Sequence, residues 1–189
     1  MNTLFPIQSV LPDGFCYHAD FLTKHEETKL HEEILKIQLH NFIFHGFKAN
    51  RKVASFGHDY SFEKKQLSKG KDIPASFDFL IDKVAIVISA PRDEFKQLLI
   101  TEYPVGSVIN WHRDAPPFDI ITGISLLSDC TFRLRPYDKA KQNRASEISI
   151  PVMRRSLYIM KGPARSEWQH STAPVKQIRY SITLRTLRN

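Results

Sequence analysis

The chain has 189 residues, of which 42% are hydrophobic and 25% are charged, a composition typical of one globular domain with a core of ordinary size. Its net charge of +7 favours an anionic partner. Two cysteines, Cys16 and Cys130, exclude a disulfide scaffold, and no apolar run is long enough to span a membrane.

Residues 1–6 lack the basic and apolar regions of a secretory signal. We therefore expect a single domain over residues 1–189 that is cytoplasmic and monomeric, has no membrane partner, and keeps both cysteines as reduced, packed thiols.

The first half of the chain predicts two helices. Residues 1–21 indicate an initial strand or loop, after which Thr23 and Glu26 form a capping box that begins a helix ending near Leu39. A second helix is predicted over residues 76–90, where apolar residues recur every three or four positions. We expect this second helix to pack on the outside of a sheet.

From residue 95 onward the pattern predicts strands only. Short apolar segments separated by turn residues indicate strands at 97–103, 107–111, 119–127, 131–135, 147–151, 156–160, 168–171 and 178–186. About eight short strands are typical of a sandwich or jelly roll. Helices followed by strands predict an α+β fold and exclude an alternating βαβ arrangement.

One stretch carries candidate metal ligands. His112 and Asp114 are two residues apart, so on an extended strand both side chains project from the same face. A second imidazole, His170, follows 56 positions after Asp114. Two histidines and one carboxylate on one face of a metal form the ligand set of non-haem Fe(II) oxygenases. The alternative interpretation of the pair alone is a solvated strand end.

The C-terminal strand alternates strictly over residues 178–185. Its apolar face consists of Ile178, Tyr180, Ile182 and Leu184, and its polar face of Arg179, Ser181, Thr183 and Arg185. Two guanidinium groups separated by small hydroxyl residues suggest a socket for a dicarboxylate, because arginine binds carboxylates in a bidentate manner. A strand whose polar face is exposed to water fits this segment equally well.

Together these segments resemble the AlkB family of 2-oxoglutarate-dependent dioxygenases. The family pattern is H-x-D, then a distant histidine in a W-x-H context, then R-x-N-x-T-x-R. This chain carries it as His112-Arg113-Asp114, then Glu167-Trp168-Gln169-His170, then Arg179-Tyr180-Ser181-Ile182-Thr183-Leu184-Arg185. The residues before His170, Gly162-Pro163-Ala164-Arg165, resemble a family turn that places this histidine. The resemblance implies a double-stranded β-helix (jelly roll) with N-terminal helices buttressing one sheet.

Two positions depart from the family pattern. Ser181 stands where the family usually has asparagine, which shortens one polar contact to the co-substrate. Pro116 stands where DNA-repair members often have an acidic residue. The second departure leaves the choice of base open.

The resemblance also implies cofactors and their ligands. His112, Asp114 and His170 would be the catalytic ligands of Fe(II), with 2-oxoglutarate and O2 in the open positions. Arg179 would bind the far carboxylate of 2-oxoglutarate, assisted by Thr101, Tyr103 and Ser181, and Arg185 would lie nearer the metal. The implied activity is oxidative demethylation of alkylated bases in DNA or RNA, as in DNA repair.

Residues 42–72 are the expected substrate-recognition lid. The stretch from Arg51 to Gly57, together with Tyr60, resembles the family's nucleotide-recognition region, and we expect a hairpin or loop with Gly57 as its hinge. Arg51 and Lys52 would contact phosphates, and Phe56 or Tyr60 would stack on an extruded base.

Basic residues are concentrated in two segments. Residues 44–71 contain seven basic residues against two acidic ones, and residues 133–144 contain five against one. Phosphate contacts would explain both. Two alternatives remain: the same chemistry on a protein side chain or small molecule, with the charge serving solubility, and a binding module without catalysis.

Overall fold

The computed structural model describes residues 11–188 except residue 45. The strands are β1 (Phe15–His18), β2 (His40–Phe44), β3 (Phe47–Ser61), β4 (Gln66–Lys69), β5 (Phe95–Tyr103), β6 (Ile109–His112), β7 (Phe118–Leu126), β8 (Cys130–Pro136), β9 (Ile148–Val152), β10 (Leu157–Met160), β11 (Trp168–Thr172) and β12 (Arg179–Leu187). The helices are α1 (Lys24–Leu35), α2 (Asp78–Ile88) and α3 (Gly162–Ser166), with 3₁₀ turns η1 (Ala75–Phe77), η2 (Arg92–Glu94), η3 (Lys139–Lys141) and η4 (Arg144–Ser146). The expectation for residues 1–6 falls outside the described residues.

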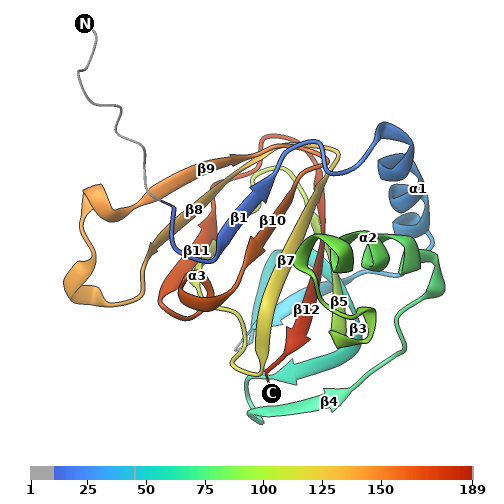
Figure 1. Cartoon of the computed structure of the whole chain (residues 1–189), viewed down its shortest axis with the longest axis horizontal. Coiled ribbons are helices and arrows are strands. Elements are labelled where there is room, and N and C mark those ends of the chain that lie inside the picture. The colour runs from blue at the N-terminus through green and yellow to red at the C-terminus, as the bar shows by residue number, and fades with distance from the viewer. Residues whose placement is uncertain (1–10, 45, 189) are drawn as a thin grey trace, which may run out of the picture.

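The strands form two antiparallel sheets. The large sheet has the order β1-β10-β7-β12-β5-β3-β2, with β4 paired to β3, and the small sheet has the order β6-β11-β8-β9. Figure 1 shows the small sheet at one side of the large sheet and helices α1 and α2 at the other. This arrangement of antiparallel sheets is the double-stranded β-helix, so the predicted fold class is confirmed.

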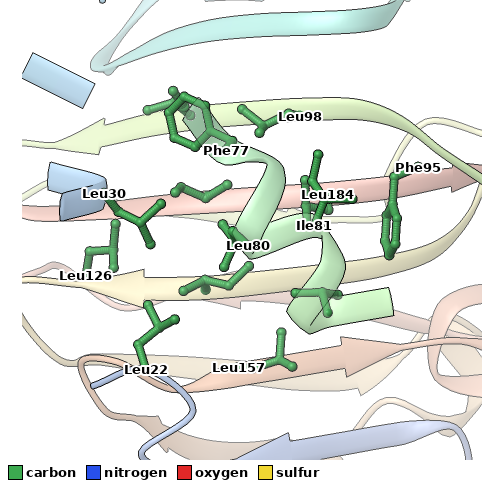
Figure 2. Packing of buried hydrophobic residues seen from close by; sticks show 14 of the residues in the cluster. Leu22, Leu30, Phe77, Leu80, Ile81, Phe95, Leu98, Leu126, Leu157 and Leu184 are labelled. Atoms are coloured by element: carbon green, nitrogen blue, oxygen red, sulfur yellow. The ribbon is translucent and has the colours of Figure 1, made fainter. Parts of the chain in front are cut away.

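Helices α1 and α2 cover the outer face of the large sheet. The capping box at the start of α1 is present, since Thr23 Oγ1 accepts a hydrogen bond from Glu26 N and Glu26 Oε2 accepts one from Thr23 N. Figure 2 shows the apolar residues of both helices meeting those of the strands. Leu30 of α1 and Leu80 of α2 are fully buried there. The helices therefore buttress one sheet, as the sequence predicts.

A second hydrophobic cluster fills the space between the two sheets. It includes Phe132 and Leu134 of β8 and Ile121 of β7. Polar residues line the rest of this interior, because the side chains of β12 alternate: Ile182 lies in the cluster beneath the helices, whereas Ser181 belongs to the opposite face. A buried polar face inside a barrel points to a binding site, since buried polar groups need partners.

Two details differ from the sequence expectations. Helix α1 ends at Leu35, four residues early, because the chain turns so that Ile37 and Leu39 pack against the helix-side cluster. Cys16 is exposed, since alternation on β1 buries Phe15 instead.

No helix among residues 11–44 and 46–188 is long and apolar enough to cross a membrane.

The expected hinge at Gly57 lies inside one continuous strand. β3 runs through this position without a break between its 15 residues. Gly57 has a φ of +79°, and a Cβ there would lie 2.1 Å from the carbonyl oxygen of Lys96. Only glycine allows the strand to approach β5 so closely. The hairpin instead forms at the end of β3, where the chain turns back into β4.

Candidate metal and co-substrate site

The three predicted metal ligands meet at one point between the sheets. His112 at the end of β6 lies opposite His170 on β11, and their ring centroids are 4.1 Å apart. Asp114 follows β6 by two residues, and its Oδ2 lies 3.5 Å from His170 Nε2. One candidate ligand atom from each residue lies within 4.8 Å of the other two. The arrangement can place two nitrogens and one oxygen on one face of an ion.

The protonation states suit a divalent cation. The pKa of His170 is lowered to about 3, chiefly by burial and also by the neighbouring His112, against the opposing effect of Asp114. Burial also lowers the pKa of His112, whose Nδ1–H donates to Asn110 O at 2.8 Å and so leaves the Nε2 lone pair free. Both imidazoles are therefore neutral at neutral pH, as metal ligands must be.

Arg185 on β12 fixes the carboxylate of Asp114. Its Nη2 donates to Asp114 Oδ1 at 2.6 Å, and its Nη1 donates to Gln97 Oε1 at 2.6 Å. Burial would raise the pKa of Asp114, but Arg185 together with His170, His112 and Arg165 holds this pKa well below its ordinary range. The carboxylate is thus anionic, with Oδ2 turned toward His170. This is the metal-end position predicted for Arg185.

Arg165 is a residue of the site that sequence reasoning did not assign. It lies on α3 and is 5% exposed. One Nη2 donates to three backbone carbonyls, those of Asp114 at 3.1 Å, Ala115 at 2.8 Å and Phe118 at 3.1 Å. The turn predicted to place His170 therefore also holds the loop that carries Asp114. No local pattern reveals this contact, because 50 residues separate its partners.

Arg179 forms the socket at the other end of β12. It is 2% exposed, its Nε donates to Ser125 Oγ at 2.9 Å, and its guanidinium carbon lies 4.9 Å from the centre of the Tyr103 ring. Within the described part of the chain, no acidic side chain forms an ion pair with it. A buried cation without a counterion is costly. The far carboxylate of 2-oxoglutarate fits this socket as the missing anion.

The predicted hydrogen-bonding partners of the co-substrate surround this socket. Strand β12 pairs with β5 so that Arg179 lies opposite Tyr103 and Ser181 lies opposite Thr101. Ser181 Oγ is 3.4 Å from the Tyr103 hydroxyl. All four residues are buried, and the structure therefore brings the predicted set together.

Tyr158 on β10 is a second residue that sequence reasoning did not assign. Its ring lies against Gly123 of β7, where a Cβ would be 2.2 Å from a ring carbon. Burial raises the pKa of Tyr158 well above its usual range, and Tyr103 and Asp114 add to this while Arg179 opposes it. The protonated hydroxyl thus lies within electrostatic reach of both ends of the site. From sequence alone, a tyrosine in an apolar strand is predicted to be a core residue.

The structure separates the predicted substrate-binding residues. Arg51 stacks on Phe42 at 4.1 Å and acts electrostatically on Tyr103 and His112, so it lies at the edge of the site. Lys52 instead pairs with Glu102, Nζ to Oε1 at 3.0 Å.

The other two aromatic candidates lie elsewhere. Phe56 packs against the cluster beneath the helices, because side chains of a strand alternate between its faces. Tyr60 packs against the cluster between the sheets and against Phe62, with ring centroids 5.1 Å apart. The expectation that Lys52 and Phe56 face the substrate is therefore corrected: both lie on the other face of β3.

Comparisons with known proteins agree with this geometry. A family model described as the 2OG-Fe(II) oxygenase superfamily matches residues 14–186. A Mus musculus protein named tRNA (carboxymethyluridine(34)-5-O)-methyltransferase ALKBH8 is 25% identical over 172 residues. The match covers 88% of this chain and 25% of the mouse protein, so the chain spans about a quarter of that relative.

Two solved structures share the fold. The structure of OsALKBH1 matches with a TM-score of 0.72 and 12% identity, covering 92% of this chain and 96% of that one. A prolyl hydroxylase from Trichoplax adhaerens, in complex with a hypoxia inducible factor oxygen degradation domain peptide fragment, matches with a TM-score of 0.65 and 17% identity, covering 92% and 83%. Identities this low demonstrate a common fold alone.

Proposed function

The chain belongs to the 2OG-Fe(II) oxygenase superfamily and is AlkB-like, and from this premise we propose that it oxidatively demethylates alkylated bases in nucleic acid. The observation that carries the proposal is Arg51, a cation at the edge of the metal site on a strongly basic hairpin. A phosphate beside the target base would satisfy this guanidinium. The tRNA in the name of the mouse relative makes RNA the first substrate to test.

The cofactors of this family are Fe(II), 2-oxoglutarate and O2. When bound, they supply the oxidation of a substrate C–H bond, with 2-oxoglutarate converted to succinate and CO2. An N-methyl group hydroxylated in this way is released as formaldehyde.

The chain's own residues would bind and orient the metal and the co-substrate. His112, Asp114 and His170 would hold Fe(II), which would supply the binding positions for co-substrate and O2. Arg185 keeps Asp114 anionic and oriented. Arg179, whose Nε donates to Ser125 Oγ, would bind the far carboxylate of 2-oxoglutarate through its planar fork. The apolar cluster between the sheets excludes water from this side of the site.

The test is product release over a panel of methylated RNA and DNA oligonucleotides. We expect at least one methylated oligonucleotide to give formaldehyde in a one-to-one ratio with succinate, above the succinate formed without substrate. The unmethylated oligonucleotide of the same sequence is the control. If no oligonucleotide stimulates succinate release while methylated peptides or small molecules do, the nucleic-acid proposal is wrong and the oxygenase chemistry stands.

A further inference from the structure

The outer face of the small sheet carries a basic and aromatic surface behind the metal ligands. Because His112, His170 and Leu134 point inward, their neighbours Trp111, Gln169, Arg133 and Arg135 point outward. Strand pairing places Gln169 beside Arg135. We call the outward residues Trp111, Arg133, Arg135 and Gln169, with Arg113, Tyr137 and Lys139, the outer surface.

Arginines on this surface stack on aromatic rings. The guanidinium carbons of Arg135 and Arg133 lie 4.4 Å and 5.1 Å from the centre of the Trp111 ring. Arg113, between the metal ligands, lies 3.5 Å from the centre of the Tyr137 ring. Stacking holds a guanidinium in place while its N–H groups remain in the plane of the fork, available to a phosphate.

The charges of these arginines are only weakly neutralised. Arg135 Nε donates to the neutral Gln169 at 2.9 Å, and Arg113 Nη1 donates to the backbone carbonyl of Ser166 at 2.8 Å. Arg133 has an acidic neighbour, Glu147, at 3.8 Å, a distance longer than a hydrogen bond. The outer surface thus presents cations that are held in position, and among the described residues Glu147 is the one acidic side chain that pairs with them, at 3.8 Å from Arg133.

A pocket of about 400 Å³ opens beside these stacks. It is lined by Arg135, Tyr137, Asp138, Lys139, Gln142 and Gln169. Asp138 Oδ1 accepts the hydrogen bond of Ala140 N at 3.0 Å, and within the described part of the chain Asp138 forms no ion pair with a cation of this pocket. The loop that joins β8 to β9 forms one wall, and Figure 1 shows this loop projecting from the molecule. The volume of this pocket is in the range of small-ligand pockets.

We propose that the outer surface binds the sugar-phosphate backbone of a single-stranded nucleic acid, next to the nucleotide that enters the metal site. The inference rests on the proposed function and names a second contact region. Gln169 precedes the ligand His170 and Arg113 follows the ligand His112, so a strand bound here passes close to the metal end of the barrel. Clustered cations interleaved with aromatic rings are typical of single-strand binding, and a single strand lets the target base leave its stack.

The experiment compares two double variants that each lose two positive charges. Arg135→Gln with Lys139→Gln changes the outer surface, and Lys29→Gln on α1 with Lys36→Gln at its C-terminal end is the matched control. Binding of a fluorescent single-stranded oligouridine is measured by anisotropy over a range of KCl concentrations. We expect the first variant to bind roughly tenfold more weakly at low salt and to lose about 1.4 from the slope of log affinity against log salt, since each phosphate contact on a single strand contributes about 0.7. The control should match the parent.

The other outcomes distinguish a failure of this inference from a failure of the proposed function. If the Arg135 and Lys139 variant keeps the parent's affinity and slope, the outer surface does not bind nucleic acid, while oxidation of oligonucleotides by the parent stands. If duplex binding weakens as much as single-strand binding, a single strand is not the specific occupant and the proposal is wrong. A parent that oxidises no alkylated oligonucleotide overturns the proposed function, and this inference with it.

Tryptophan fluorescence gives a second readout that does not depend on charge. The chain has two tryptophans, Trp111 and Trp168. We expect the fluorescence change on adding oligouridine to disappear in Trp111→Phe and to persist in Trp168→Phe. A change that persists in Trp111→Phe contradicts contact at the outer surface.

Discussion

Strands β12 and β3 flank the same strand, β5, yet they use their alternating side chains in different ways. On β12 every second residue is polar and turned inward, and Arg179 is buried without an acidic partner in the described chain. On β3 the two neighbouring cations separate: Arg51 lies at the edge of the site, and Lys52 pairs with Glu102. Alternation over several residues therefore identifies a strand that builds a site. A contiguous cluster of charged and aromatic residues does not.

The largest effect is expected where β12 reaches the metal. Asp114→Ala removes both a ligand and the partner of Arg185, so it should lower metal affinity at least about a hundredfold and abolish succinate release. His170→Ala, on β11 of the small sheet, should do the same. Calorimetric titration with Mn(II) measures the first quantity, and circular dichroism checks that both variants fold. Turnover of 2-oxoglutarate at the parent's rate in either variant would refute the metal assignment.

The next effect tests the buried cation of β12. Arg179→Lys keeps the charge but loses the bidentate fork, and we expect a KM for 2-oxoglutarate roughly tenfold higher with metal affinity unchanged. Steady-state succinate release measures KM. Lys52→Arg on β3 is the control, because its side chain pairs with Glu102 outside the socket. An unchanged KM for Arg179→Lys would place the dicarboxylate elsewhere, with Arg185 as the next candidate.

The third prediction separates the two neighbours on β3. Arg51→Gln should lower kcat/KM for an alkylated oligonucleotide roughly tenfold, because it removes a charged contact at the edge of the site. Lys52→Gln should change it less than about twofold, since a half-exposed ion pair contributes little. Turnover of 2-oxoglutarate without substrate should be unaffected in both. Equal losses in the two variants would mean that β3 contacts nucleic acid through both faces, contrary to the observed packing.

The smallest effect concerns Tyr158, the hydroxyl between the two ends of the site. Tyr158→Phe keeps the ring that lies against Gly123, and we expect about threefold weaker binding of 2-oxoglutarate to the Mn(II)-loaded protein. Tyr17→Phe on β1, whose hydroxyl accepts from Met153 N, is the matched control. Equal affinities in parent and Tyr158→Phe would show that this hydroxyl does not contact the co-substrate.

Sequence patterns predicted those parts of the site that follow a local rule. The spacing of His112 and Asp114 placed both ligands on one side, and alternation over residues 178–185 placed Arg179 and Arg185 on the same face. Periodicity and a capping box predicted the two helices, and periodicity placed α2 on the outside of a sheet. Each of these predictions depends only on neighbours within a few residues, which is why sequence sufficed.

The missed residues depend on pairing between distant strands. Arg165 contacts carbonyl groups about 50 positions earlier, and Tyr158 reaches the site only because β10 pairs with β7. The family resemblance treats residues 51–60 as one stretch and so predicts that Phe56 contacts the substrate. The register of β3 against β5 decides which side chains point into the site, and it turns Phe56 toward the helices.

The contact between Gly123 and Tyr158 also constrains the order in which this interior can change by mutation. Any side chain at position 123 would overlap the ring at position 158, with a Cβ 2.2 Å from its nearest atom. A substitution at 123 is therefore blocked until the tyrosine has been replaced by a smaller residue, whereas the tyrosine can be lost first. Among relatives, an aromatic residue at the second position should occur together with glycine at the first, and this pairing can be read from sequence without any structure.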